Sequence, residues 1–175
     1  MKFTVKSNSL VFPNYLVILW VILVPHLLFW KLWTPDSILG VPGSDSLSQG
    51  FIFTQYAWQS LKMDHAFAWY NPWIFCGMPF IESCSYEYFY PMNWIFIFLP
   101  VAFAFGYQYV FHLFVIPLIA FFPAKRLVHS RLGAWFLIAS YQLSAHLISL
   151  SYPGHGGKFF AILWMLPIVL VFMLF

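Results

Sequence analysis

Residues 107–131 read YQYVFHLFVIPLIAFFPAKRLVHSR, and this stretch decides which kind of fold the chain can adopt. Its first part, residues 107–123, is mostly apolar and is followed at once by the basic residues Lys125, Arg126 and Arg131. An apolar run of this length is close to the ~20 residues that a helix needs to cross a bilayer. Positive charge directly after such a run is typical of a cytoplasmic helix end. The stretch therefore predicts a membrane-spanning helix that ends in the cytoplasm.

Three further apolar runs of similar length flank this stretch, at residues 15–33, 132–150 and 159–175. The overall composition agrees with them, because 62% of the residues are hydrophobic and only 7% are charged. Soluble domains carry about 25% charged residues. The sequence therefore predicts an all-α integral membrane protein with about four transmembrane helices, forming a single membrane domain over residues 1–175.

Residues 91–105 are apolar but too short to span the membrane, since a helix of this length reaches only about 22 Å. Pro100 also interrupts them, and we predict an interfacial or re-entrant segment here. If the segment crossed the membrane, the basic residues of 124–131 would lie on the opposite side from Lys2 and Lys6, against the positive-inside rule. The predicted topology therefore places the N-terminus and residues 124–131 in the cytoplasm.

The longest segment without an apolar run, residues 34–91, is predicted to be a large first extracytoplasmic loop with many turn-forming Gly and Pro residues. All the acidic residues of the chain fall within it. Inside this loop, residues 46–63 show helical spacing of polar and apolar side chains, which predicts an amphipathic helix along the membrane surface. The polar face would hold Ser48, Gln55, Gln59 and Lys62, and the apolar face Leu47, Phe51, Trp58 and Leu61.

Asp45 directly precedes this predicted helix, and two roles are open to it. Its carboxylate could cap the helix by accepting backbone N–H bonds and by complementing the helix dipole. It could instead act as a general base at the membrane interface, with Gln49 one turn further on and on the same face. The two roles are compatible, because a capping carboxylate keeps free lone pairs.

Glu82 and Glu87 lie in the same loop and could bind a divalent cation together with Asp45, because hard cations prefer oxygen ligands. Solvation of two surface carboxylates is the alternative. Cys76 and Cys84 form neither a zinc motif nor a CxxC pair, and a disulfide between them is possible if the loop faces an oxidising compartment. The sequence thus predicts no dedicated metal site and no certain cofactor.

Four pieces of the chain, taken in order, carry a resemblance to a known family: GSDSLSQ at 43–49, WYNPWIFCGMPF at 69–80, YFYPMNWIF at 88–96 and PGHGGKFFAILWMLP at 153–167. They resemble the opening half of membrane glycosyltransferases of the GT-C superfamily, most closely its bacterial YfhO-like branch. The resemblance implies an inverting transfer of sugar from a polyprenyl-phosphate-linked donor on the extracytoplasmic face of the bacterial inner membrane. It also implies an acidic residue in the first outer loop, a place that Asp45 takes.

A polyprenyl phosphate leaves as a stabilised anion, so one base and one cationic clamp would be enough for this transfer. His155 and Lys158 are the candidate clamp, because the glycines around them let backbone approach a phosphate. A plain turn with a solvated lysine is the alternative. Gln49 is a further candidate for substrate binding. The implied partners are membrane lipid and the lipid-linked sugar donor.

Members of this family have more spans than this chain, which ends at Phe175 inside an apolar run, so we expect an N-terminal part of a larger fold. The rival interpretation is a non-catalytic accessory subunit of a larger membrane complex, with other membrane subunits as partners. His112 and His146 lie within predicted spans and could face a cofactor there. Nucleic acid is excluded as a partner, because the net charge of +3 comes from very few groups.

Overall fold

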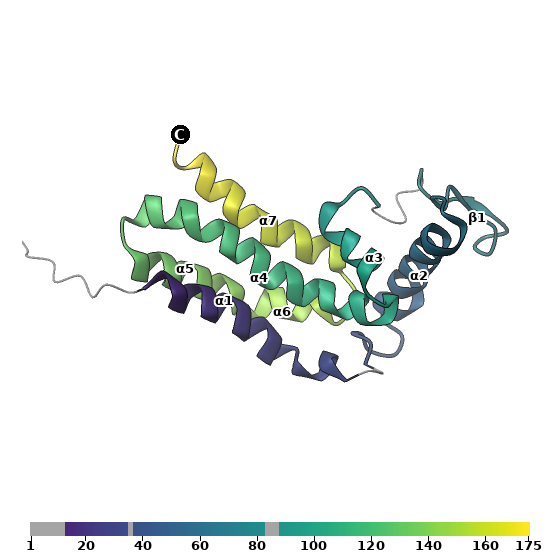
Figure 1. Ribbon diagram of the computed structural model, residues 1–175, viewed down its shortest axis with the longest axis horizontal. Helices are drawn as coiled ribbons and strands as arrows, with labels where there is room; N and C mark the ends of the chain where they lie inside the picture. The colour runs from purple at the N-terminus through teal and green to yellow at the C-terminus, as the bar shows by residue number, and fades with distance from the viewer. Residues whose placement is uncertain (1–12, 35–36, 83–87) are drawn as a thin grey trace, which may run out of the picture.

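The computed structural model describes residues 13–34, 37–82 and 88–175, and it shows a helical bundle with a smaller lobe at one end (Figure 1). Outside the described residues lie five that entered the sequence predictions: Lys2, Lys6, Asp36, Cys84 and Glu87. Most of the described chain is helical, as the sequence predicts, and the described strands form one two-stranded sheet.

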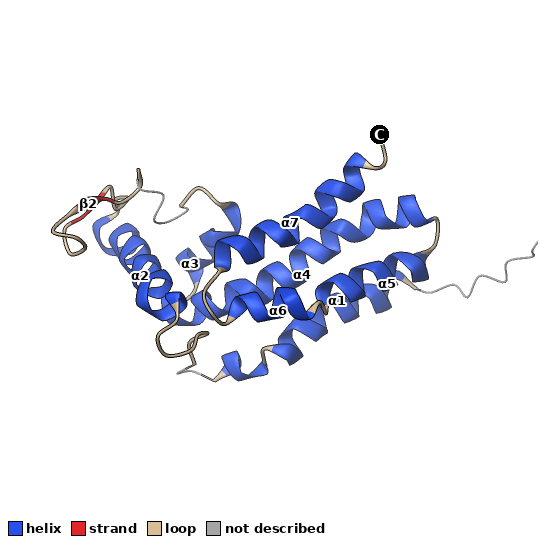
Figure 2. Ribbon diagram, turned by 180° about the vertical axis from the view of Figure 1, so that it is seen from behind, coloured by secondary structure: helices blue, strands red, loops and turns tan. Residues whose placement is uncertain are grey.

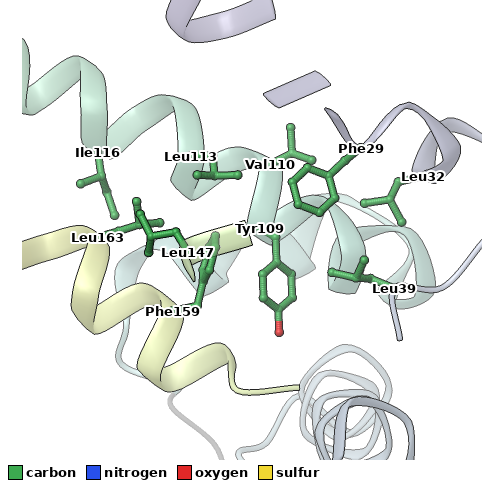
Figure 3. Close-up of a cluster of buried hydrophobic side chains, with 10 residues drawn as sticks. All are labelled: Phe29, Leu32, Leu39, Tyr109, Val110, Leu113, Ile116, Leu147, Phe159 and Leu163. Atoms are coloured by element: carbon green, nitrogen blue, oxygen red, sulfur yellow. The ribbon is translucent and has the colours of Figure 1, made fainter. Parts of the chain in front are cut away.

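The bundle consists of α1 (Asn14–Leu28), α4 (Val101–Val128), α5 (Arg131–Gln142), α6 (Ala145–Ser151) and α7 (Gly156–Phe172). α4 is its central helix, because α1, α5 and α7 all pack against it (Figures 1 and 2). Figure 3 shows the part of the core nearest the lobe, where apolar side chains of α4 and α7 meet those that follow α1. Every other bundle helix therefore takes its position from α4 directly or through a neighbour.

α4 has 28 residues and is the one described helix that is long and apolar enough to cross a membrane. At 1.5 Å per residue it reaches about 42 Å. The sequence predicts a separate segment over 91–105, but the structure places residues 101–105 in α4, after a 3-10 turn (Pro91–Trp94) and the short helix α3 (Ile95–Phe98). Pro100 is the N-cap of α4, where its missing N–H is not needed. The proline predicted to interrupt a short segment thus begins a long helix.

The other predicted spans also differ from the observed helices. α1 is followed by a 3-10 turn (Trp30–Trp33), and residues 132–150 are divided between α5 and α6 by Leu143 and Ser144. α1 and α7 are apolar but have fewer than 18 residues each. Four transmembrane helices therefore stay a prediction.

One glutamine of α5 supplies the hydrogen-bond donors that two prolines remove from neighbouring helices. Pro25 and Pro117 have no N–H, so the carbonyls four residues earlier, those of Val21 and Leu113, lose their usual helical donors. The Nε2 atom of Gln142 donates to both carbonyls, at 3.0 and 2.9 Å. Gln142 is fully buried. One side-chain amide thus satisfies both freed carbonyls and joins α1, α4 and α5.

The lobe is built around a continuous helical stretch, at the place where the sequence predicts a helix over residues 46–63. α2 (Phe51–Gln59) is extended on both sides by π-helical turns, Ser46–Gly50 and Ser60–Asp64. Of the predicted apolar face, Trp58 is buried and the other three side chains are half-buried, whereas Gln59 is exposed on the polar face. That this helix lies along a membrane surface stays a prediction.

The rest of the lobe packs onto α2 through a small antiparallel sheet, β1 (Tyr70–Asn71) and β2 (Met78–Pro79). Tyr88 joins the parts, because its hydroxyl donates to the Ala57 carbonyl at 2.8 Å and accepts from the Ala68 N–H at 3.2 Å. Burial raises the pKa of Tyr88, and the hydrogen bond from Ala68 opposes this shift. The lobe is therefore held together by specific bonds as well as by its aromatic core.

The outer surface of the bundle is apolar, like its core. α1 exposes Leu19, Leu23 and Leu27 by 46–68%, and α7 exposes Ile168 and Phe172 by 62% and 81%. A helix that is apolar on all sides belongs in a protein interior or a membrane. These helices lie at the bundle surface, so water is an unfavourable solvent for their outer faces.

Replacing Gln142 should expose how far the bundle depends on it. We expect Gln142→Leu to lower the free energy of unfolding by about 2–4 kcal/mol, because two buried carbonyls lose their donors. In a Pro25→Ala background the same change should cost about 1–2 kcal/mol less, since the substitution restores a backbone N–H that can donate to the Val21 carbonyl. Denaturant titration in detergent measures both. Equal costs in the two backgrounds, or a cost no larger than that of the exposed control Gln59→Leu, would contradict this role.

Candidate functional site

Two loops that lie far apart in the sequence meet at the lobe end of the bundle. Gly154 has a φ of +98° and packs on the peptide between Asp45 and Ser46. A Cβ at Gly154 would lie 2.1 Å from the Ser46 backbone nitrogen and 2.8 Å from the Asp45 carbonyl carbon. Only glycine tolerates both that φ and that approach. The loop before α7 therefore rests directly on the start of the lobe helix.

The Asp45 carboxylate is not used for capping. Asp45 already has helical dihedrals (φ −61°, ψ −24°), and its side chain makes no capping hydrogen bond. The Ser44 carbonyl accepts from the N–H groups of Leu47 and Ser48, at 3.1 and 3.0 Å, so the helix begins one residue earlier than the capping role requires. The capping prediction for this side chain is wrong. The side chain of Asp45 is exposed, which leaves its oxygens free for the role of a base.

The other predicted site residues lie on the same two segments. Gln49 is exposed, one turn after Asp45. His155 is half-buried at the N-cap of α7, where its carbonyl accepts the Phe159 N–H at 2.9 Å. Lys158 is exposed in the first turn of α7 and forms no ion pair with the described part of the chain. The contact at Gly154 brings these two segments together, which the sequence alone does not show.

Several residues beneath this junction were not identified from the sequence. The side-chain oxygens of Ser44 and Ser46 are buried and have no hydrogen-bond partner among the described residues. The Tyr109 hydroxyl lies 3.0 Å from the position that a Cβ at Gly156 would occupy. In Figure 3 the Tyr109 ring carries its hydroxyl away from the apolar cluster. Ser44 and Ser46 lie within the quoted piece at 43–49, but their burial depends on contacts with distant segments, so the sequence assigned no role to them.

A chain of hydrogen bonds ties the lobe to α4 and α7 beside the junction. Nδ1 of His112 lies 2.6 Å from the Gln108 carbonyl, and its Nε2 lies 2.8 Å from the Tyr90 hydroxyl. The Trp164 Nε1–H donates to the same hydroxyl at 2.6 Å. A neutral imidazole with its proton on Nδ1 satisfies this chain, since Tyr90 then donates to Nε2 and accepts from Trp164.

This chain bears on the possibility of a histidine-held cofactor. Both ring nitrogens of His112 have partners, and the ring stacks on Phe160 with 3.9 Å between centroids. Binding a metal through Nε2 would break the bond to Tyr90. His146 is exposed on α6. His112 is therefore a poor candidate for a cofactor ligand, because both of its ring nitrogens already have partners.

The predicted cation site is only partly visible. Glu82 is exposed, and Glu87 lies outside the described residues. Within the described ranges, no three His, Cys, Asp or Glu side chains form a group that could hold a metal ion. Cys76 is exposed, and its predicted partner Cys84 is also outside the described chain. The divalent cation and the disulfide both stay predictions.

Comparison of the chain with protein-family models, with curated proteins and with solved structures finds no match.

The close approach at Gly154 can be separated from its backbone strain by a matched pair of variants. Gly43 also has a positive φ, +80°, but open space where a Cβ would lie. We expect Gly43→Ala to lower the free energy of unfolding by about 1–2 kcal/mol through strain alone. Gly154→Ala should cost at least about 2 kcal/mol more, because its Cβ would collide with backbone. Equal melting temperatures for the two variants would rule out the contact.

Proposed function

We propose that this chain is embedded in a membrane and forms part of an extracytoplasmic glycosyltransferase site, using a polyprenyl-phosphate-linked sugar donor. The observation that carries the proposal is the contact of Gly154 with the Asp45–Ser46 peptide. It joins the segment of Asp45, whose carboxylate is exposed and makes no helix-capping hydrogen bond, to the loop that carries His155 and Lys158. An acid and two basic groups thus belong to one junction at one end of an apolar bundle.

The surface of the bundle supports the membrane part of the proposal. Outward-facing leucines of α1 and the outward face of α7 would be favourably solvated by lipid and unfavourably by water. α4 is longer than the ~30 Å hydrocarbon core requires, so its lobe end can extend into the interface. The junction would then lie where a lipid-borne donor presents its headgroup.

The chemistry requires little beyond these groups. The acceptor hydroxyl attacks the anomeric carbon, the bond from this carbon to the phosphate oxygen breaks, and the phosphate leaves with the electron pair. Asp45 takes the proton of the acceptor hydroxyl, and one displacement inverts the configuration. Lys158 and His155 would stabilise the charge on the leaving phosphate. Gln49, one turn from the base, would hydrogen-bond sugar hydroxyls.

Asp45→Asn tests the base directly. The carboxylate makes no capping bond, so the variant should fold normally, whereas loss of a general base typically lowers the rate by 10²- to 10⁴-fold. Asp64→Asn, at the far end of the same helical stretch, is the matched control and should retain the wild-type rate. Transfer of labelled sugar from a polyprenyl-phosphate donor is the measurement. A rate within about threefold of wild type for folded Asp45→Asn would remove Asp45 from the mechanism.

Cysteine labelling tests the proposed orientation. Asp64 and Arg126 are both exposed and lie in the lobe and in the last turn of α4. In a background where Cys76 and Cys84 are serine, we expect an impermeant thiol reagent to label Asp64→Cys in intact cells. Arg126→Cys should react only after the membrane is opened, as the positive-inside rule requires. The reverse pattern would overturn the topology.

A further inference from the structure

We propose that the end of the bundle opposite the lobe binds an anionic phospholipid of the cytoplasmic leaflet, with the phosphate on Arg126 and an acyl chain between α4 and α7. Two hollows of about 490 and 590 Å³ lie between these helices. They adjoin, because Val171 and Phe175 line both of them. Together they form one groove, the α4–α7 groove, with walls from within residues 119–126 and 164–175.

The groove lies where α4 and α7 separate. Pro123 is inside α4 and Pro167 is inside α7, and both line the groove. A proline within a helix cannot donate to the carbonyl one turn back, and it bends the helix. Figures 1 and 2 show α7 leaving α4 towards its C-terminal end. The groove is open to the surroundings there, since Ile119 and Val171 in its walls are 42% and 46% exposed.

The walls of the groove suit a hydrocarbon chain. Apart from Arg126 and Trp164, every side chain that lines it is aliphatic, a proline or a phenylalanine. The Trp164 indole N–H is used in its bond to Tyr90, so a polar ligand would lose hydrogen bonds on entering. From Trp164 to Phe172 the helix rises by about 12 Å. Half of the ~30 Å hydrocarbon core is about 15 Å, so the chain of a lipid in one leaflet fits along the groove.

Arg126 supplies a positive charge within the groove. It is one of the lining residues and is exposed in the last turn of α4. The acidic residues of the described chain, Asp45, Asp64 and Glu82, all belong to the lobe at the other end of the molecule, so none of them pairs with Arg126 (Figure 1). A guanidinium group can bind a phosphate through two parallel hydrogen bonds. Basic pockets between membrane helices on the cytoplasmic side are typical sites for anionic lipid headgroups.

The same charge disfavours a second copy of the chain as the occupant. In a symmetric dimer the same face of both chains meets at a two-fold axis. Two chains with the same topology have this axis along the membrane normal, so both Arg126 side chains would lie at one depth and face each other. Like charges at such a contact repel. The groove therefore fits a negatively charged lipid better than a second copy.

The headgroup is tested by native mass spectrometry of the delipidated full chain in detergent, titrated with dioleoyl phosphatidylglycerol or dioleoyl phosphatidylcholine. The two probes have the same acyl chains, and only phosphatidylglycerol carries a net negative charge. We expect the wild type to bind phosphatidylglycerol about five- to tenfold more tightly, since one cation near the headgroups contributes roughly this factor. Arg126→Gln should abolish the preference, and Arg126→Lys should retain part of it.

Arg131→Gln is the matched control for the headgroup, because Arg131 is an exposed cation at the same end of the bundle and does not line the groove. It should keep the wild-type preference. Since Arg126 is also exposed, its variants should keep the wild-type melting temperature. An unchanged preference in Arg126→Gln, or an equal loss in Arg131→Gln, would overturn the assignment of the phosphate to Arg126.

The acyl chain is tested by filling the groove. Val171→Trp places a large side chain between the two hollows and should weaken binding of both probes by about tenfold. Val169→Trp is its control, because Val169 is 47% exposed on the same helix and lies outside the groove walls. Equal affinities in these two variants would overturn the proposal. A dimer that Val171→Trp dissociates, with lipid binding unchanged, would assign the groove to a second copy and overturn the lipid.

The inference rests on the membrane part of the proposed function and is independent of sugar transfer. Asp45→Asn should keep the preference for phosphatidylglycerol, because Asp45 does not line the groove. A wild-type chain that shows the preference but transfers no sugar would count against the glycosyltransferase and leave the lipid site standing. A chain that transfers sugar but binds both probes equally would overturn the lipid site and leave the proposed function standing.

Discussion

The bundle depends on one buried side chain that donates hydrogen bonds to two backbone carbonyls, each of which a proline leaves without its helical donor. Pro25 and Pro117 remove helical donors from α1 and α4, and an unsatisfied carbonyl is costly in an apolar interior. The two N–H groups of the Gln142 amide reach both carbonyls. Because the three groups belong to three helices, their bonds fix how far α5 can slide along α1 and α4. The prolines and the glutamine therefore act as one unit, although 121 residues separate Gln142 from Val21.

The lobe end of the molecule follows from the position of α4. Tyr90, His112 and Trp164 form a hydrogen-bonded chain from the lobe through α4 to α7. With α7 held there, the loop before it lies against the first turn of the lobe helix, where Gly154 contacts backbone. The distance between the Asp45 segment and the basic loop is thus set by helix packing in the bundle. The proposed catalytic groups are surface side chains on a framework of buried contacts.

Asp45 shows how local structure can leave a reactive group available. Helical dihedrals begin at Asp45 itself, and the Ser44 carbonyl accepts the first helical bonds. The carboxylate consequently has no structural task, and solvation or a ligand must satisfy it. The same division appears on α7, where Trp164 uses its indole N–H in a bond to Tyr90 and Lys158 stays exposed. Structural and proposed functional polar groups are therefore different residues.

The sequence by itself determined the mostly helical fold and the helical stretch that contains Trp58, because helical periodicity and apolar content are local properties. It also identified Asp45 as a candidate base and His155 and Lys158 as candidate phosphate-binding residues. Only the tertiary structure decided that Pro100 begins α4, that Gln142 serves two prolines, and that Gly154 lies on the Asp45–Ser46 peptide. Each of these depends on contacts between distant segments or on which of several allowed helix starts packs best. Spacing along the chain carries no information about such contacts, since they are selected by the packing of whole helices.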